Sequence, residues 1–326
     1  MNNYDSIIIS SRIRLARNLS GFNFPNKIKS KTEADEIIAL IFDELKNFEN
    51  YKVKDLSESI LLSLKEKHMI SQDLVNNIEY GALSLSSDET ISIMINEEEH
   101  IREQCILKGF KLNEALEKLN EVDDTLIEDL KISYDENLGF LTTCSSNLGT
   151  GMRASVMMFL PGLTITNSIQ NLISTLSKVG LTVRGNYGEG TDADGFVYQI
   201  SNSQTLGISE ENIINNVATA VMKICEKEFE AREKIKKAND SELINKIYRA
   251  YGILKHGYMI TSSEATKLLS QVKFGVCLNI LDCVKIETID ELLEDILPNT
   301  LTNISGEEMT SEERDIFRAS YISKKI

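Results

Sequence analysis

The stretch from Leu141 to Pro161, with the sequence LTTCSSNLGTGMRASVMMFLP, constrains the fold of this chain more than any other. The run of apolar residues and threonines from Phe140 to Thr143 predicts a buried strand that delivers Cys144. An Asn-Leu-Gly-Thr-Gly turn follows, and its glycines indicate a sharp loop. Arg153 then begins an apolar segment, which we expect to form a helix that Pro161 ends.

The same stretch has the residue types of an anion site. Glycines let backbone N–H groups approach a phosphate closely, and an arginine beside them pairs with its charge. A cysteine held near positive charge is stabilised as a thiolate. Taken alone, however, the stretch is better described as a glycine turn before a core helix, with a buried cysteine and a solvated arginine. Other segments of the chain are needed to distinguish an anion site from a structural turn.

The composition is typical of a soluble globular protein with one large and one smaller domain, or two medium ones. Of 326 residues, 42% are hydrophobic and 26% are charged, and the net charge is −15. Such an acidic chain is not expected to bind nucleic acid directly. No apolar run approaches the roughly 20 residues of a membrane span. The N-terminus also lacks the basic region and long apolar run of a signal peptide.

The five cysteines form no Cys-x-x-Cys pair and their number is odd, which indicates free thiols in a reducing cytoplasm. They are Cys105, Cys144, Cys225, Cys277 and Cys283. The histidines His68, His100 and His256 lie far apart in the sequence. We therefore expect no zinc site and no metal ion bound directly by the protein.

Near the N-terminus, alternation places Arg12 and Arg14 on one face of an extended segment and Ile13 on the other. Two arginines on one strand face repel each other unless an anion or carboxylates lie opposite. A polar, outward-facing strand is the competing interpretation. His68 follows a leucine-rich segment and is, by itself, more typical of a surface residue than of a ligand.

Two short alternating runs, 82–85 and 91–95, predict a hairpin that ends in the sequence NEEEHIR. The carboxylates Glu97 to Glu99 repel one another unless a cation or a cationic substrate relieves the repulsion. A solvated acidic turn is the alternative.

A second hairpin is predicted over 181–202, and its glycine-rich loop carries Arg184 and Glu189. This loop has two possible interpretations, a lid that closes over a site and a plain surface hairpin.

Helical patterns cover the remaining long segments. A highly charged region over 232–241 indicates a domain boundary, and the chain after it is helical by periodicity. The expected helices are 32–48, 112–130, 167–179, a long helix capped by Ser209, and several within 240–326.

Pooled together, these segments supply five arginines beside turns, with carboxylates and a cysteine. Five guanidinium groups suit a triphosphate in a chain without a GxxxxGK loop, because arginine binds phosphate oxygens in pairs. Carboxylates beside them suit a second substrate that is itself a guanidinium.

The segments SSRIR, NEEEHIR, CSSNLGTGMRASV and VRGNYGEG resemble, in order and spacing, the signature blocks of the phosphagen (guanidino) kinase family. The resemblance covers about residues 7 to 225. It implies that ATP is bound by Arg12, Arg14, Arg102, Arg153 and Arg184, with His68 near the adenine. It also implies Glu98 as the catalytic carboxylate, with Glu97, Glu189 and Cys144 completing the catalytic set. Glu99 stands where the family has an aspartate.

Two features narrow the resemblance to the bacterial protein-arginine kinases. The helical domain that precedes the first block in phosphagen kinases is missing, and a helical tail follows the catalytic part. The tail contains Arg314, Asp315 and Arg318 in a segment similar to the RDxxRA motif by which that group binds phosphoarginine. A solvated surface helix is the simpler alternative for this segment.

We therefore expect an α+β catalytic domain over 1–236, an antiparallel sheet flanked by helices of the guanidino kinase or glutamine synthetase-like type. A helical C-terminal domain would occupy 237–326. The expected activity is ATP- and Mg²⁺-dependent phosphorylation of protein arginines, in stress response and protein quality control. Kinase activity on free arginine and a non-catalytic phosphoarginine adaptor are the alternatives.

The resemblance also implies partners. They are protein substrates with exposed arginines, such as a basic transcriptional repressor, together with an activator protein and the Clp protease machinery. We expect a cytoplasmic homodimer that binds neither membrane nor nucleic acid.

Overall fold

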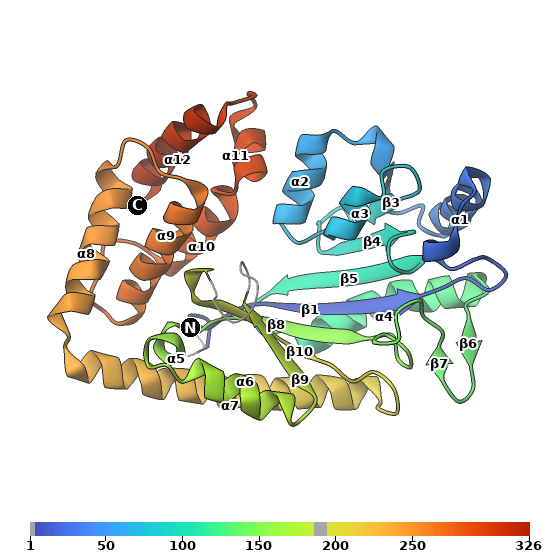
Figure 1. Cartoon of the computed structure of the whole chain (residues 1–326), viewed down its shortest axis with the longest axis horizontal. Coiled ribbons are helices and arrows are strands. Elements are labelled where there is room, and N and C mark those ends of the chain that lie inside the picture. The colour runs from blue at the N-terminus through green and yellow to red at the C-terminus, as the bar shows by residue number, and fades with distance from the viewer. Residues whose placement is uncertain (1–3, 186–193) are drawn as a thin grey trace.

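The computed structural model describes residues 4–185 and 194–326. Its centre is an antiparallel eight-stranded sheet with the strand order β2-β3-β4-β5-β1-β8-β10-β9 (Figure 1). A two-stranded sheet, β6-β7, lies beside it. The strands are β1 (Ile8–Arg17), β2 (Glu49–Lys52), β3 (Ala82–Leu85), β4 (Ile91–Ile95), β5 (Ile101–Lys108), β6 (Tyr134–Asp135), β7 (Gly139–Phe140), β8 (Arg153–Phe159), β9 (Leu181–Gly185) and β10 (Val197–Asn202).

Helices surround this sheet and form the whole C-terminal part, as expected for an α+β fold with a helical tail. They are α1 (Lys31–Glu44), α2 (Glu58–Glu66), α3 (Gln72–Asn76), α4 (Leu112–Asp129), α5 (Pro161–Ile165), α6 (Ile169–Ser177), α7 (Glu210–Ala238), α8 (Ser241–His256), α9 (Ser262–Cys277), α10 (Ile286–Asp295), α11 (Pro298–Ser305) and α12 (Ser311–Lys325). None of the helices in the described parts of the chain has the length and hydropathy of a membrane span.

The two faces of the sheet have different surroundings. Helices α4 and α7 pack against one face, where the main hydrophobic core lies (Figure 1). On the opposite face α2 and α3 cover the β3–β4 end, in a smaller core that includes Leu83 and Met94. On that face the middle strands carry polar side chains, and no helix among the described residues packs over Arg12 and Arg14 as α2 and α3 do over the β3–β4 end. Strand β1 shows this directly: Ile13 and Leu15 are fully buried, whereas Arg12 and Arg14 are half-buried on the open face.

The C-terminal helices form a second core and also contact the sheet domain. Helix α9 packs against the segment Asp194–Phe196, with Phe274 buried beside Phe159 of β8. Helix α11 packs against α2 (Figure 1). The predicted boundary at residue 236 falls within the last turn of α7, three residues before the left-handed Asn239.

Most predicted elements are confirmed, including both hairpins, the Ser209 cap of α7 and the helices near 32–48, 112–130 and 167–179. The predicted helix between Arg153 and Pro161 is wrong. This segment is strand β8, paired with β1 on one side and β10 on the other. Its apolar run reflects burial in the middle of a sheet rather than a helical stripe. Pro161 opens α5 instead of ending a helix.

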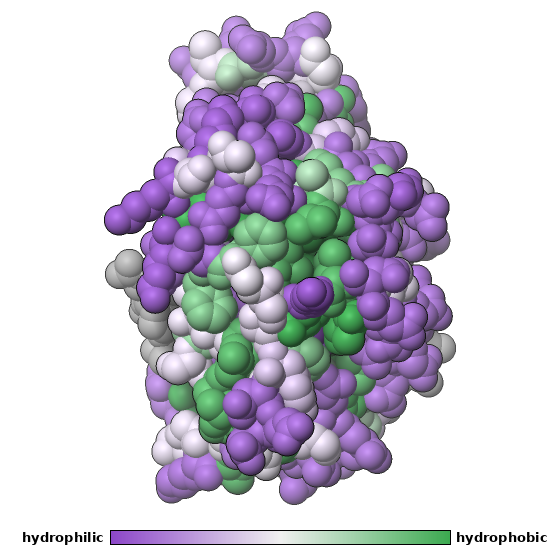
Figure 2. Space-filling view, turned by 90° about the vertical axis from the view of Figure 1, so that its right-hand side faces the viewer, coloured by the Kyte–Doolittle hydropathy of each residue, from purple (hydrophilic) through white to green (hydrophobic). Residues whose placement is uncertain are grey.

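The strand predicted over 140–143 is also shorter than expected, because β7 ends at Phe140. Beside it, Tyr134 and Leu138 of the β6–β7 hairpin are exposed. Figure 2 shows hydrophobic surface gathered on this side of the molecule.

Candidate active site

A row of arginines crosses the open face of the sheet. In the register, Arg14 on β1 lies opposite Arg153 on β8, and Arg102 on β5 lies opposite Ala16 on β1. Residues that alternate along a strand share a face, so Arg12, two positions from Arg14, joins the same row. The β-sheet thus brings together four arginines that are up to 141 positions apart in the sequence.

These guanidinium groups repel one another. Burial, with Arg102 and Arg153 as further causes, lowers the pKa of Arg12 to about 10. Burial and the same neighbours, together with Arg12, lower the pKa of Arg14 well below its ordinary value. Among the residues that the structure describes, Arg12, Arg14 and Arg153 have no carboxylate at ion-pairing distance. Their nearest partners are neutral: Gln199 Oε1 accepts from Arg12 at 3.0 Å, and Ser201 Oγ accepts from Arg153 at 3.1 Å. In the row, Arg102 is the arginine that has a carboxylate partner among the described residues, namely Glu97.

Arg184 extends the row at the edge of the sheet. It is paired with Gln199 across β9 and β10 and is exposed to solvent. Its charge contributes, after burial, to the lowered pKa of Arg153. All five predicted arginines therefore lie on one face. Glu189, the predicted second carboxylate, lies outside the described residues.

His68 stands at one end of the row, just after α2. The backbone is left-handed there, with φ of 61°, and its carbonyl accepts from the Gln104 amide at 2.8 Å. Burial, and next the charge of Arg12, lowers the pKa of His68 to about 4. The imidazole is thus neutral beside the arginines at ordinary pH.

The three consecutive glutamates have three different environments. Glu97 is buried and forms an ion pair with Arg102 and a hydrogen bond with Ser71. Burial alone would raise its pKa, but Arg102 and these hydrogen bonds bring the pKa below the ordinary value. Glu99 is fully buried. Only Glu98 is half-exposed, with its carboxylate near Arg153 and a 3.3 Å hydrogen bond from Asn147. Glu98 is the carboxylate of the three that can reach a substrate.

Glu99 organises the loop that carries Cys144. Its carboxylate accepts from the backbone N–H of Thr143 at 2.7 Å and of Cys144 at 3.3 Å. It also accepts from the side-chain amides of Asn147 at 3.1 Å and Asn18 at 2.6 Å. The family resemblance identifies Glu99 only as a replacement for aspartate. No pattern in the sequence distinguishes Glu99 from Glu97 and Glu98, because the donors that it accepts from lie in distant segments.

The Cys144 side chain lies at the end of this network, half-buried, with its sulfur 3.1 Å from Ser146 Oγ. Asn147 donates to both Glu98 and Glu99, so one amide links the cysteine loop to the exposed carboxylate. The geometry thus connects the Cys144 loop to Glu98 through Asn147.

The glycines of the turn after Cys144 are required by close backbone approach. Gly151 has φ of 65°, and a Cβ there would lie 2.6 Å from both the Ala16 carbonyl and an Arg17 nitrogen. Arg17 is itself buried, in a two-point pair with Asp123 at 3.0 and 2.7 Å, and it also donates to Thr150 O at 3.0 Å. The turn is therefore fastened to β1 rather than available as a loose phosphate loop.

The two arginines of the tail motif, Arg314 and Arg318, have different environments in the structure. Helix α12 begins with the predicted cap at Thr310, which forms a capping box with Glu313. Arg318 is buried and donates to the backbone carbonyls of Ile296 at 2.8 Å and Ile260 at 3.0 Å, besides pairing with Asp315. Arg314 is half-buried, and its Nε has no hydrogen-bond partner in the described structure. Arg318 is thus engaged in contacts within the C-terminal helices, whereas Arg314 keeps a donor without a partner in the described structure.

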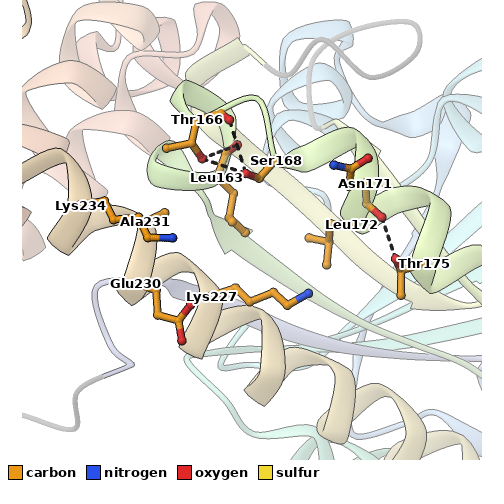
Figure 3. A pocket seen from close by; sticks show the side chains of 10 residues that line it. All are labelled: Leu163, Thr166, Ser168, Asn171, Leu172, Thr175, Lys227, Glu230, Ala231 and Lys234. Carbon is orange, nitrogen blue, oxygen red and sulfur yellow. Dashed lines mark hydrogen bonds between the residues drawn. The ribbon is translucent and has the colours of Figure 1, made fainter.

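A hollow of about 330 Å³ lies elsewhere, between α5, α6 and α7 (Figure 3). Its polar lining comes from Thr166 and Ser168 between α5 and α6, from Asn171 and Thr175 of α6, and from Lys227, Glu230 and Lys234 of α7. None of the predicted site residues lines it. The five predicted arginines thus lie on one face of the sheet and not in this hollow. The described residues also contain no cluster of three or more His, Cys, Asp or Glu that would hold a metal ion.

Comparison with known proteins agrees with this geometry. The family model described as ATP:guanido phosphotransferase, C-terminal catalytic domain, matches residues 29–231. The chain belongs to the ATP:guanido phosphotransferase family. The model described as Protein-arginine kinase McsB C-terminal domain matches residues 240–326. The resemblance to guanidino kinases and to the protein-arginine kinases among them is confirmed.

Full-length relatives in this family carry the name protein-arginine kinase. The chain is 45% identical over 324 residues to that of Clostridium tetani, covering 98% of this chain and 95% of the relative. It is 42% identical over 328 residues to that of Geobacillus stearothermophilus, covering 98% and 90%. As a member of this family the chain is a kinase.

Solved structures of family members share the catalytic fold. A duplicated taurocyamine kinase from Schistosoma mansoni superposes with a TM-score of 0.61 and 29% identity, over 70% of this chain and 34% of that one. A lombricine kinase gives a TM-score of 0.60 and 26% identity, over 69% of this chain and 66% of that one. The matched part is the guanidino kinase catalytic fold, which the sequence predicted.

Proposed function

We propose that this kinase transfers the γ-phosphoryl group of ATP to a guanidinium nitrogen of protein arginines. The observation that carries the proposal is the row of arginines beside a single half-exposed carboxylate. Arg12, Arg14 and Arg153 repel one another without a counter-ion, and a triphosphate would supply it. Glu98 lies at the mouth of the same site, where a cationic acceptor would be placed.

In the proposed reaction, the bond between the γ-phosphorus and the oxygen to the β-phosphate breaks while a bond to a guanidinium nitrogen forms. ADP leaves with the bridging oxygen, and one N–H proton passes to Glu98. A free guanidinium has a pKa above 12, so proton removal is late and coupled to bond formation. The arginine row stabilises the negative charge on the transferring phosphoryl group. The remaining rate enhancement comes mostly from positioning the two substrates.

Cys144 and Glu189 complete the proposed catalytic set. The Cys144 loop is tied to Glu98 through Asn147, which suits a side chain that orients the acceptor nitrogen. Glu97 is assigned to positioning Arg102, since its carboxylate is already occupied by that ion pair. His68, neutral and adjacent to Arg12, is assigned to the base of ATP.

Mg²⁺ is proposed to enter on the nucleotide. The donor set fits this arrangement, because the open face offers guanidinium groups for phosphate oxygens rather than a cluster of acidic ligands. When bound to the phosphates, Mg²⁺ would supply further charge neutralisation.

The tail is proposed to bind phosphoarginine, with Arg314 as the residue that meets the ligand. The support is its buried Nε without a partner, whereas Arg318 is already committed to backbone carbonyls. Several further expectations stay predictions. They are the division into domains 1–236 and 237–326, a homodimer, a cytoplasmic location, an activator, a basic repressor as substrate, and a link to Clp proteolysis in stress response.

Incubation with γ-labelled ATP and a basic protein tests the function. Label should enter the protein in a form that is lost in mild acid and stable in base, as a P–N bond requires. Mass spectrometry should place it on arginine. Acid-stable label on serine or threonine, or no label at all with intact ATP binding, would contradict the proposal.

A further inference from the structure

Helix α11 of the C-terminal part begins without a cap of its own. The residue before it is Leu297, whose side chain cannot accept a hydrogen bond, and Pro298 occupies the first position. A helix start leaves backbone N–H groups without intrahelical partners, and a carboxylate there is stabilised by the helix dipole.

Glu66 supplies this cap from the other side of the interface. Its carboxylate accepts from the backbone N–H of Asn299 at 3.0 Å and of Thr300 at 2.8 Å. It also accepts from the Asn299 amide at 2.7 Å and the Thr300 hydroxyl at 2.9 Å. One half-buried side chain on α2 thus holds the start of α11 through backbone and side-chain donors together. Figure 1 shows the two helices side by side at the top of the molecule.

Glu66 is the last residue of α2, and His68 follows two positions later. The chain turns there with a left-handed His68, whose N–H donates to Lys65 O at 2.9 Å. On the sheet side, Gln104 of β5 holds the carbonyls of His68 at 2.8 Å and Met69 at 2.7 Å. On the outer side, α2 is held by α11. The position of His68 against Arg12 therefore depends on contacts within the sheet domain and on the contact of α2 with α11.

We propose that Glu66 is a positioning residue for the nucleotide, which acts by fastening α11 to α2 and so fixing His68 beside the arginine row. The proposal rests on the proposed function, in which His68 contacts the base of ATP. It assigns the C-terminal helices a part in nucleotide binding, since they support one wall of the site. Glu66 does not touch the reacting atoms, so its loss weakens ATP binding and leaves the chemical step unchanged.

The same attachment lies next to the tail motif. Arg318 donates to the carbonyl of Ile296, which lies two residues before Pro298. The negative charge of Glu66 is close enough to Arg318 to favour its charged form.

The test compares full-length Glu66→Gln with wild type. We expect KM for ATP and Kd for ADP, the latter from titration calorimetry, to rise by about threefold to tenfold, the scale of one ordinary net hydrogen bond. The value of kcat should stay within about twofold. Ser59→Ala is the matched control, because it removes a single exposed hydrogen bond, 3.1 Å to Asn303, from the same pair of helices. It should change neither constant.

Asn299→Asp is the second variant, because it places a carboxylate opposite Glu66 and loosens the attachment from the α11 side. The same rise in KM and Kd is expected, and this variant answers the question if Glu66→Gln does not fold. Unchanged KM and Kd, or a fall in kcat alone, would overturn the role of Glu66. Failure of wild type to bind ADP would instead overturn the proposed nucleotide site itself.

Discussion

Asn147 donates its side-chain amide to Glu98 at 3.3 Å and thereby joins the cysteine loop to the only one of three consecutive glutamates that reaches solvent. The other two carboxylates are held inside, one by Arg102 and one by the loop. Identical residue types in a row have therefore been divided by the fold into one candidate base and two structural anchors. This division makes the roles of the three glutamates separable by mutation.

Glu98→Gln keeps the shape of the side chain and removes its basicity. Phosphorylation should fall by roughly 10²–10⁴, with the affinity for ADP retained, as general-base loss requires. Glu97→Gln is the comparison: it leaves Arg102 unpaired, so it should weaken ADP binding and lower the melting temperature. Steady-state kinetics and calorimetry on both variants check the assignment. Near-normal turnover in Glu98→Gln would remove Glu98 from the mechanism.

Glu99→Gln should loosen the Cys144 loop, because the amide cannot accept from the donors of Asn18, Thr143 and Asn147 together. We expect kcat to fall by about tenfold to a hundredfold, as for the loss of an orienting contact. The rate at which iodoacetamide labels Cys144 should also change, measured in a Cys283→Ser background because Cys283 is exposed. An unchanged labelling rate would show that Glu99 does not set the position of the cysteine.

Arg14→Met should stabilise the protein in the absence of nucleotide, because it relieves repulsion from Arg12, Arg102 and Arg153. A rise in melting temperature of about 1–3 °C is expected, the shift that roughly 1 kcal/mol gives in a chain of this size. ATP should then stabilise the variant less than it stabilises wild type, since a phosphate contact is lost. If the variant melts lower than wild type without nucleotide, the row is not a site of unrelieved repulsion.

The two arginines of the tail should respond differently to truncation. Arg318→Ala removes buried hydrogen bonds to the Ile296 and Ile260 carbonyls and should destabilise the protein by about 2–4 kcal/mol. Arg314→Ala should leave the melting temperature within about 1 °C and abolish phosphoarginine binding by calorimetry. Equal phosphoarginine affinity in Arg314→Ala and wild type would leave the tail as a structural helix only.

Alternation predicted that Arg12 and Arg14 lie on one face of a strand, and the structure places them so. The other arginines of the row followed from the family resemblance and not from the sequence pattern. It failed at Arg153–Phe159, where burial on both faces removes the alternation that distinguishes a strand from a helix. The roles of Glu99 and Glu66 could not be predicted either. Each depends on donors brought from distant segments, and those partners are visible only after the chain has folded.

The central claim, that arginine within proteins is the acceptor, is tested most directly by competition between two acceptors. A basic protein and free arginine are incubated separately with labelled ATP and the kinase, and kcat/KM is measured for each. The account predicts acid-labile label on protein arginines and a kcat/KM for free arginine lower by at least about a hundredfold. Saturable, efficient turnover of free arginine, with no label on protein arginines, would contradict it.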